Sequence, residues 1–466
     1  MIHRLPGIRV LHRELRSRRA TVRALAGTVS AGVVIQLTLV LSGIVLARAL
    51  GPEDRGHLAL LVLVAAIASG LGPMGVPYAL SYTLARVPQR AADVIRELRK
   101  AIVIQLGAAV GCAGVAVAVL TANRPGYVQA GAFMVLVAVP SSMVQSYGLG
   151  ALQGLRRFRA FNLLRVAPNA AFAVAATVLF VTDVRGFIAM AYAYGISRAV
   201  FAPLTLATAW RSATAEQSGD GAELPATSWM LRFGRRSMFG GTPVVEAYRV
   251  DQAIVGLFLP PVALGIYVVA LALTNLPRFI ARSVGMVATP SVAGRRTQQL
   301  ARAAMWRFSW LAVPLYLPLI VALWLAAPTL VEFFFGAEFS EAASITRLLL
   351  IATALYCARR VLIDAARGAG YPGLGSVAEI AALVSVVALA AVFVPMWDTD
   401  GVAYALIGSS AIALAVLIIG LLLPSARGAV PGEGWLETTT GVDGRKEGID
   451  EVPPSPAEPV SPSAQP

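Results

Sequence analysis

Charged residues are scarce in this chain: 14% of its 466 residues are Asp, Glu, Lys or Arg, whereas 57% are hydrophobic. Soluble domains carry about 25% charged residues, so the composition excludes a water-soluble globular protein. Lysine occurs only at Lys100 and Lys446. This excludes a phosphate-binding loop of the Gly-x-x-x-x-Gly-Lys-Ser/Thr type, and with it an ATP-hydrolysing domain.

Cysteine and histidine are almost absent as well. Cys112 and Cys357 both fall in the middle of apolar runs, where we expect two buried thiols and no disulfide. The three histidines, His3, His12 and His57, lack the spacing of metal ligands. We therefore predict no metal site and no cofactor.

Three further features are missing. The apolar run after the Arg-rich leader exceeds 20 residues, too long for a signal peptide. No large extracytoplasmic loop carries paired acids or histidines, so we predict no catalytic residues and no membrane glycosyltransferase, polymerase or ligase activity. No periodic Arg-rich voltage sensor or filter-like loop is present, which argues against a channel.

What the chain does have is a series of apolar runs near the length of about 20 residues that crosses a bilayer. We predict an all-α integral membrane protein with about twelve transmembrane helices. The predicted spans are residues 25–47, 57–85, 101–121, 127–150, 162–182, 186–209, 237–259, 262–289, 303–327, 341–364, 374–396 and 400–423.

The basic residues predict the orientation. If the chain crosses twelve times, 33 of its 39 Lys and Arg residues lie on one side. Arg48, Arg55, Arg124 and Arg185 are assigned to the opposite side, and Arg249 and Arg347 to the spans. Cytoplasmic loops carry the excess of Lys and Arg, so we predict a multi-pass protein of the cytoplasmic membrane with both termini inside. The net charge of +14 is thereby explained without nucleic acid.

The chain divides into five parts. A basic cytoplasmic leader (1–24) precedes an N-terminal six-helix lobe (25–210), a polar cytoplasmic linker (211–236) and a C-terminal six-helix lobe (237–424). The tail (425–466) is rich in Pro, Gly, Ser and Glu. Because it cannot bury a core, we predict that it is disordered.

The two lobes resemble each other. A shift of 209 residues aligns Pro52 with Pro261 and Gly56 with Gly265, and a shift of 214 aligns Gly154 with Gly368. Six spans is an even number, so both lobes start from the same side. We predict a parallel repeat about an axis along the membrane normal, with a central cavity between the lobes as the substrate site.

The seventh span carries three charges within six residues: Glu246, Arg249 and Asp251. A charge at bilayer depth costs at least about 2.5–3.5 kcal/mol, so these side chains should face protein or a water-filled cavity. If the span is a continuous helix, Glu246 and Arg249 are i,i+3 neighbours that can pair, and Asp251 points about 160° away. A structural salt bridge and a cavity wall for a substrate or coupling cation both stay open.

The eighth span carries Asn275, Arg278 and Arg282, which we assign to the same cavity. Guanidinium groups bind phosphate through paired hydrogen bonds, although both arginines are also placed to reach lipid headgroups. Arg86 and Arg198 have the same two interpretations.

The second span carries Gly70, Pro73 and Pro77. Prolines inside a span release backbone carbonyls and permit bending. We therefore predict a hinge there.

Several ordered motifs resemble the polysaccharide transporter branch of the multidrug/oligosaccharidyl-lipid/polysaccharide (MOP) flippase superfamily. They are Leu-Ala-Arg-Ala-Leu-Gly-Pro-Glu-Asp-Arg-Gly-His-Leu-Ala (46–59), Tyr-Arg-Val-Asp-Gln-Ala-Ile-Val-Gly-Leu-Phe-Leu-Pro-Pro-Val-Ala-Leu-Gly-Ile-Tyr (248–267), Ala-Thr-Pro-Ser (288–291), Glu-Phe-Phe-Phe-Gly-Ala-Glu-Phe-Ser-Glu-Ala-Ala (332–343) and Arg-Gly-Ala-Gly-Tyr-Pro (367–372). In the second of these, which covers the seventh span and the turn after it, Asp251, Gly265 and Tyr267 match family positions. The resemblance implies two six-helix lobes around a cavity that opens alternately to each side. It also implies a lipid-linked oligosaccharide as cargo, usually on undecaprenyl pyrophosphate.

From these observations we expect a flippase for a lipid-linked saccharide, in contact with membrane lipids and with polysaccharide assembly proteins as candidate partners. A coupling ion, H⁺ or Na⁺, or the membrane potential would supply the energy. Two alternatives stay open: a drug or cation antiporter of the same superfamily, and a non-transporting scaffold for cell-envelope assembly. An integral-membrane enzyme is disfavoured by the missing loop.

Overall fold

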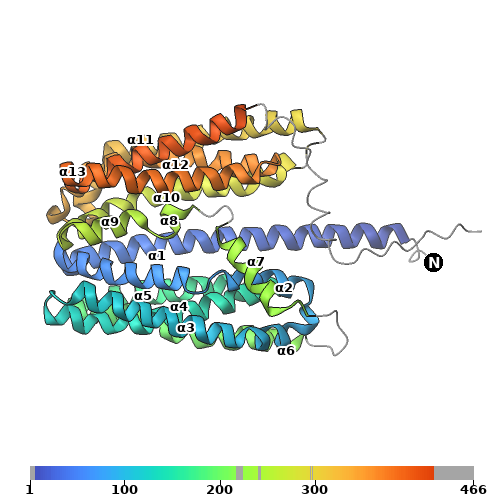
Figure 1. The fold of residues 1–466 in the computed structure, drawn as a ribbon, viewed down its shortest axis with the longest axis horizontal. Coiled ribbons are helices and arrows are strands. Elements are labelled where there is room, and N and C mark those ends of the chain that lie inside the picture. Colours follow the sequence, from blue (N-terminus) through green and yellow to red (C-terminus); the bar gives the residue numbers. More distant parts are fainter. Residues whose placement is uncertain (1–5, 217–223, 240–242, 294, 296, 424–466) are drawn as a thin grey trace, which may run out of the picture.

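In the computed structural model, residues 6–216, 224–239, 243–293, 295 and 297–423 are described. Most of the residues in these ranges are helical, and the helices run side by side in two groups with α1 along their boundary (Figure 1). The predicted tail 425–466 lies outside the described residues, as does part of the predicted linker.

The first group, the N-lobe, contains six spans. Helix α1 (Pro6–Leu71) bends sharply at Gly51 (φ 66°), so it supplies the first span and most of the second. Helix α2 (Val76–Arg86) completes the second span, and the short 3-10 helix η1 (Pro88–Arg90) follows it. The remaining spans are α3 (Ala91–Thr121), α4 (Gly126–Gly154), α5 (Phe158–Val181) and α6 (Phe187–Ala215).

The second group, the C-lobe, begins after the linker helix α7 (Thr227–Phe239), which packs against α2. The seventh span is formed by α8 (Val244–Ala247) and α9 (Val250–Phe258). It is followed by α10 (Pro261–Ala293), α11 (Gln298–Phe335), η2 (Ala337–Phe339) and α12 (Ala342–Gly368). Helix α13 (Pro372–Leu422) bends at Trp397 and Asp398 and supplies the last two spans.

Eight helices in the described residues are long and apolar enough to cross a membrane. With α1 and α13 each divided at its bend, and with α9 and the charge-bearing α12 added, the predicted twelve spans are all present. The prediction of two six-helix lobes is therefore confirmed. Both cysteines are free, but only Cys357 is buried. The expectation of two buried thiols is wrong for Cys112, which is exposed on the outer face of α3.

The internal repeat predicted from the sequence has a structural counterpart. Gly154, after the fourth span, packs on the backbone of Ser81, and Gly368, after the tenth, packs on the backbone of Thr289. Each lobe thus closes its fourth span against its second through a glycine without a side chain. The same contact in both lobes is what a repeated fold requires.

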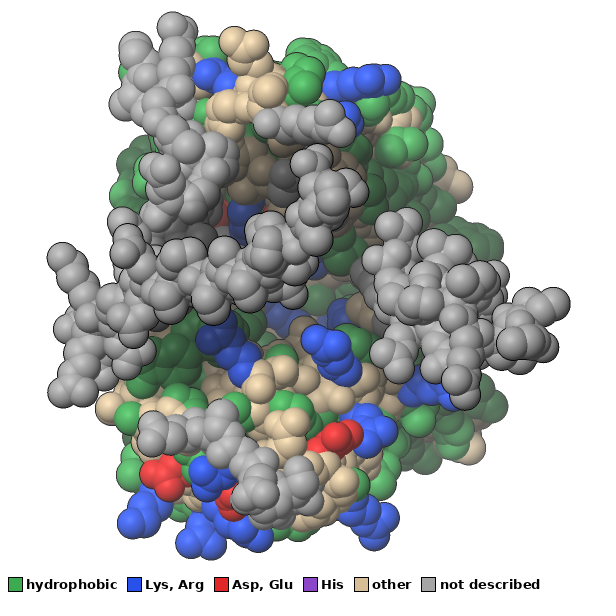
Figure 2. All heavy atoms as spheres, turned by 90° about the vertical axis from the view of Figure 1, so that its right-hand side faces the viewer, with side chains coloured by type: hydrophobic (Ala, Val, Ile, Leu, Met, Phe, Trp, Pro, Cys, Tyr) green, Lys and Arg blue, Asp and Glu red, His purple; other side chains and the backbone are tan. Residues whose placement is uncertain are grey.

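The lobes meet at one end of the bundle, which we call the closed end; it holds the bend at Gly51 and the turn before Pro261. There Gly56 lies against Pro261, and Gly265 lies against Pro52. The other end, which we call the open end, holds the linker helix α7 and the N-terminal part of α1 (Figure 1). Figure 2 looks onto the open end and shows a hollow between the lobes with Lys and Arg side chains inside it.

Candidate functional site

A cavity of about 440 Å³ lies between the two lobes. Its walls come from α1, α5 and α6 of the N-lobe and from α8, α9 and α10 of the C-lobe. All six residues assigned to the cavity from the sequence line it: Glu246, Arg249, Asp251, Asn275, Arg278 and Arg282. The structure also adds Arg55, Asn169, Arg198 and Gln252 to the lining.

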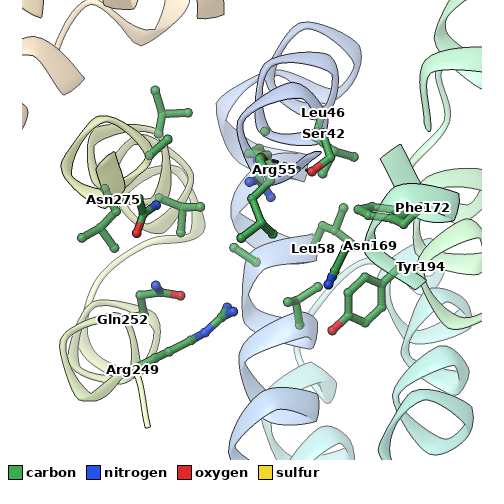
Figure 3. A pocket seen from close by; sticks show the side chains of 18 of the residues that line it. Ser42, Leu46, Arg55, Leu58, Asn169, Phe172, Tyr194, Arg249, Gln252 and Asn275 are labelled. Carbon is green, nitrogen blue, oxygen red and sulfur yellow. Dashed lines mark hydrogen bonds between the residues drawn. The ribbon is translucent and has the colours of Figure 1, made fainter. Parts of the chain in front are cut away.

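The seventh span is not one continuous helix. Helix α8 ends at Ala247, Arg249 adopts a left-handed conformation (φ 52°), and α9 begins at Val250. Irregular backbone at membrane depth is tolerated where it is buried in protein or lines a water-filled cavity. The break carries Arg249 to the cavity wall, and Figure 3 shows its side chain extending toward α1.

Because of this break, the pairing of Glu246 with Arg249 that the sequence allowed does not form. Glu246 instead lies 3.5 Å from the guanidinium of Arg359, and Arg359 also lies 3.5 Å from Glu379. Arg359 is 1% exposed. Arg359 belongs to the 33 basic residues that the sequence analysis counted on the cytoplasmic side, but α12 continues to Gly368 and buries it. Two acids from α8 and α13 therefore share one cation from α12.

Asp251 has a different partner. It is 6% exposed and accepts a hydrogen bond of 2.9 Å from the hydroxyl of Tyr267, which is fully buried on α10. Both carboxylates of the cavity lining are thus already engaged within the C-lobe. The sequence placed Asp251 far round the helix from Arg249, yet both line the cavity because α9 starts only after the break.

The arginines of α10 are held by α12. Arg278 donates long hydrogen bonds of 3.3 and 3.4 Å to the hydroxyl of Thr353, and its guanidinium lies 5.4 Å from the centre of the Tyr356 ring. Arg282 donates to the hydroxyl of Tyr356 at 3.3 Å. At 1.5 Å per residue, the two arginines lie about 25 and 30 Å along α10 from its start at the closed end. Arg282 is exposed, so it marks the mouth of the cavity.

Arg55 lines the cavity, although the sequence analysis predicted that it lies in a link outside the membrane. It was counted in an extracytoplasmic loop, but Gly51 turns the chain without a loop, and Arg55 lies one helical turn further along α1. The residue is 9% exposed, and its Nε atom has no partner among the described residues. Arg249 likewise forms no hydrogen bond or ion pair with any described residue. Both guanidinium groups are therefore available to a ligand at the inner part of the cavity.

The predicted hinge coincides with a break in the second span. Helix α1 ends at Leu71, Gly70 lies in its last turn, and α2 begins at Val76 with Pro77 in its first turn. Pro73 lies between them, in a turn where Met74 and Gly75 have positive φ angles. None of the three lines the cavity. Whether the segment bends during transport stays a prediction.

The described residues contain no group of three His, Cys, Asp or Glu side chains close enough to hold a metal ion. The polar groups of the cavity lining are dominated instead by five arginines, with three amides and two engaged acids. Such a lining binds anions and hydroxyl groups.

Comparison with known proteins identifies the fold. The family described as "Polysaccharide biosynthesis protein" matches residues 45–344. An inward-facing multidrug resistance MATE family transporter of the MOP superfamily is 19% identical, with a TM-score of 0.62, covering 84% of this chain and 94% of its own. Lipid II flippase MurJ, in an inward closed conformation, is 13% identical with a TM-score of 0.62, covering 84% and 87%.

A third similar structure is a MOP superfamily transporter from Pyrococcus furiosus, described as having a binding pocket of reverse polarity that suggests a different function. It is 18% identical with a TM-score of 0.56, covering 88% of this chain and 95% of its own. At such identities the resemblance shows the fold alone: the chain is folded like these transporters. No curated protein sequence matches the chain.

Proposed function

The chain belongs to the polysaccharide biosynthesis protein family, and on that premise we propose that it is a flippase for a lipid-linked oligosaccharide or polysaccharide precursor. It would move this cargo across the cytoplasmic membrane by alternating access. In this proposal the open end faces the cytoplasm and both termini are cytoplasmic. The excess of Lys and Arg on that side supports the orientation.

The observation that carries the proposal is the charge of the cavity. Five arginines line it, whereas its two acids are engaged by Arg359 and by Tyr267. The charge left for a ligand is therefore positive. A pyrophosphate group presents several negative oxygens that guanidinium groups bind through charge-assisted hydrogen bonds. The cationic lining offsets the cost of bringing that anion into the membrane.

The positions of the arginines suggest a path. Arg282 and Arg278 lie toward the open end, where newly made lipid-linked sugar would arrive, and Arg249 and Arg55 lie further in. The headgroup would pass from one guanidinium group to the next while the lipid tail stays in the bilayer. Undecaprenyl pyrophosphate is the carrier that this path would accept.

For the energy source we propose the membrane potential, H⁺ or Na⁺. Each negative charge that leaves a cell with a negative interior releases about 2.3 kcal/mol per 100 mV. An anionic cargo would therefore be driven outward without a dedicated ion site. A coupling ion would instead need a titratable or oxygen-rich site, for which Glu246 and Glu379 are the strongest candidates in the described residues.

The drug or cation antiporter alternative is favoured by the structural likeness to a multidrug transporter. A cationic drug, however, would meet five like charges in this cavity. The scaffold alternative depends on the termini and predicts that transport is dispensable. Interaction with cell-envelope assembly proteins is compatible with either a flippase or a scaffold.

One experiment separates these functions. In a strain that lacks the protein, lipid-linked oligosaccharide should accumulate on the cytoplasmic side, and the wild-type gene should clear it. A strain with unchanged lipid-linked sugar but greater sensitivity to cationic dyes would point to the antiporter. If an Arg278→Lys variant that is defective in lipid clearance still supports assembly, the scaffold is favoured.

A further inference from the structure

The two walls of the cavity differ in chemistry. The C-lobe wall presents the guanidinium groups of Arg249, Arg278 and Arg282. On the N-lobe side, α5 (Asn169, Phe172) and α6 (Tyr194, Arg198) present an amide, two aromatic rings and one arginine. We call these four residues the N-lobe wall; Arg55, on α1, is not part of it. Figure 3 shows Asn169 and Tyr194 extending from the N-lobe side and Arg249 extending from the other. A ligand that fills the cavity touches both walls.

The four residues of the N-lobe wall form one connected patch. The rings of Phe172 and Tyr194 meet edge to face with centroids 5.4 Å apart. The guanidinium of Arg198 lies 3.8 Å from the centre of the Tyr194 ring, and its Nη2 atom donates a long hydrogen bond of 3.5 Å to the Asn169 carbonyl oxygen. Because each side chain touches the next, the patch holds its donors in fixed positions.

Several of these donors have no partner in the described part of the chain. The Nη1 atom of Arg198 is buried without a hydrogen bond. The half-buried Asn169 amide nitrogen and Tyr194 hydroxyl form none with described residues either. For the buried Arg198 donor, the missing hydrogen bond costs about 1–3 kcal/mol. The cost is relieved if a bound molecule supplies acceptor oxygens at this wall.

We infer that the N-lobe wall binds the sugar next to the pyrophosphate, while the C-lobe arginines bind the pyrophosphate itself. This inference rests on the proposed function. A sugar ring offers hydroxyl oxygens, which accept from Asn169, Tyr194 and Arg198. It also offers an apolar C–H face, which packs against the rings of Phe172 and Tyr194. The wall is less suited to phosphate, since its single guanidinium already stacks on Tyr194 and bonds to Asn169.

A sugar site at the N-lobe wall predicts that substitutions in the two lobes have different effects, which phosphate binding alone does not predict. Substitutions in the N-lobe wall should affect only a carrier that bears sugar, because they remove contacts to the sugar. Substitutions of the C-lobe arginines should affect carriers with and without sugar. Asn169 and Tyr194 thereby become determinants of specificity, because their donors meet hydroxyl groups whose positions differ from one sugar to another.

The test uses the full chain in lipid nanodiscs and two probes: undecaprenyl pyrophosphate without sugar, and the lipid-linked oligosaccharide extracted from cells that lack this protein. Binding is measured for Tyr194→Phe, Asn169→Leu and Arg278→Lys. The matched control is Tyr192→Phe, because Tyr192 lies on the same helix, is exposed, and does not line the cavity.

We expect Tyr194→Phe and Asn169→Leu each to weaken binding of the sugar-bearing lipid about tenfold, the loss of one buried hydrogen bond. Their affinity for the sugar-free lipid should match the wild type, whereas Arg278→Lys should weaken both. Equal loss for both lipids, or no loss for either, would overturn the assignment while leaving the phosphate site intact. A wild-type protein that binds neither lipid would instead overturn the proposed function, and this inference with it.

Discussion

Gly56 lies so close to Pro261 that a Cβ atom added at Gly56 would overlap the proline carbonyl oxygen. The reciprocal contact has the same character, since a Cβ atom at Gly265 would overlap the carbonyl oxygen of Pro52. These are the two pairs that the 209-residue shift aligns. The repeat axis therefore passes through this contact, where each lobe inserts its proline turn against the glycine of the other.

We predict that Gly56→Val prevents the closed end from closing. The side chain cannot fit against Pro261, and overpacking of this kind costs roughly 1–3 kcal/mol where the neighbour can shift. The equilibrium should move toward a state in which the lobes part at this end. A cysteine at Arg55 should then become accessible to a membrane-impermeant maleimide from the side of the closed end.

Gly107→Val is the control, because a Cβ atom at Gly107 meets no atom within 4 Å. Unchanged labelling in Gly56→Val would show that the contact does not seal the cavity.

The sequence predicted the spans well, because an apolar run of bilayer length and the alternation of basic links are local signals. It also located the paired prolines and glycines, because both lobes retain them at one shift. It could not predict that α8 and α9 are separate helices, although Gly240, Gly241 and Pro243 stand just before the break. Glycine and proline residues before a span are compatible with a kink or with two separate helices, and the sequence does not show how the segment packs against α10 and α13.

The errors at the site have a common physical origin. Glu246 and Arg359 are 113 residues apart in the sequence. Arg359 also pairs with Glu379, which lies on a third helix, α13. Ion pairs between spans depend on helix rotation, which helical spacing within one span does not fix. Arg55 was left out of the predicted cavity for a different reason. Helix α1 bends at Gly51 without forming a loop, so Arg55, which was expected in a solvent-exposed link, is buried in the cavity wall.

The buried triad leads to a second prediction. Replacing Arg359 with Met leaves Glu246 and Glu379 without their shared cation, and breaking a buried ion pair in this way costs about 3–5 kcal/mol. We expect Arg359→Met to reduce the amount of folded protein in the membrane sharply, as measured by fluorescence-detected gel filtration. Adding Glu246→Gln and Glu379→Gln should restore much of it. Arg367→Met is the control, since that arginine pairs with Asp364 at a more exposed position on α12. A stable Arg359→Met protein would show that the acids are protonated or otherwise neutralised.

A third prediction concerns topology. In a chain with Cys112→Ala, whose other native cysteine, Cys357, is buried, cysteines introduced at Ser218 in the linker and at Ser455 in the tail should react with an impermeant maleimide only after cell lysis. A cysteine at Asp183, in the turn at the closed end, should react in intact cells. The excess of basic residues at the open end is the reason. Labelling of Ser218→Cys in intact cells would reverse the proposed orientation.

The tail gives a fourth prediction. Its composition does not support a packed core, so truncation after Ala429 should leave the amount of membrane protein and its elution profile unchanged. Lower protein levels would mean that the tail packs against the lobes. Normal levels with lost polysaccharide export would favour the scaffold alternative, because the spans would be intact while an interaction segment was missing.

The last prediction concerns Arg278 and Arg282. Lysine keeps the positive charge but loses the planar fork of donors that binds two phosphate oxygens at once. If these arginines bind the pyrophosphate, Arg278→Lys and Arg282→Lys should each weaken carrier binding roughly tenfold, the equivalent of about one charge-assisted hydrogen bond. Clearance of accumulated lipid-linked oligosaccharide should slow accordingly at normal protein levels.

Arg295→Lys provides the matched control, because Arg295 is exposed in the link between α10 and α11 and does not line the central cavity. Its binding and clearance should equal those of the wild type. The hydrogen bonds of Arg278 to Thr353 and of Arg282 to Tyr356 are long, at 3.3–3.4 Å. Both guanidinium groups can therefore turn toward a ligand at little cost. Normal transport by both lysine variants would show that the two arginines anchor α10 at the headgroups, and the phosphate path would then have to begin at Arg249.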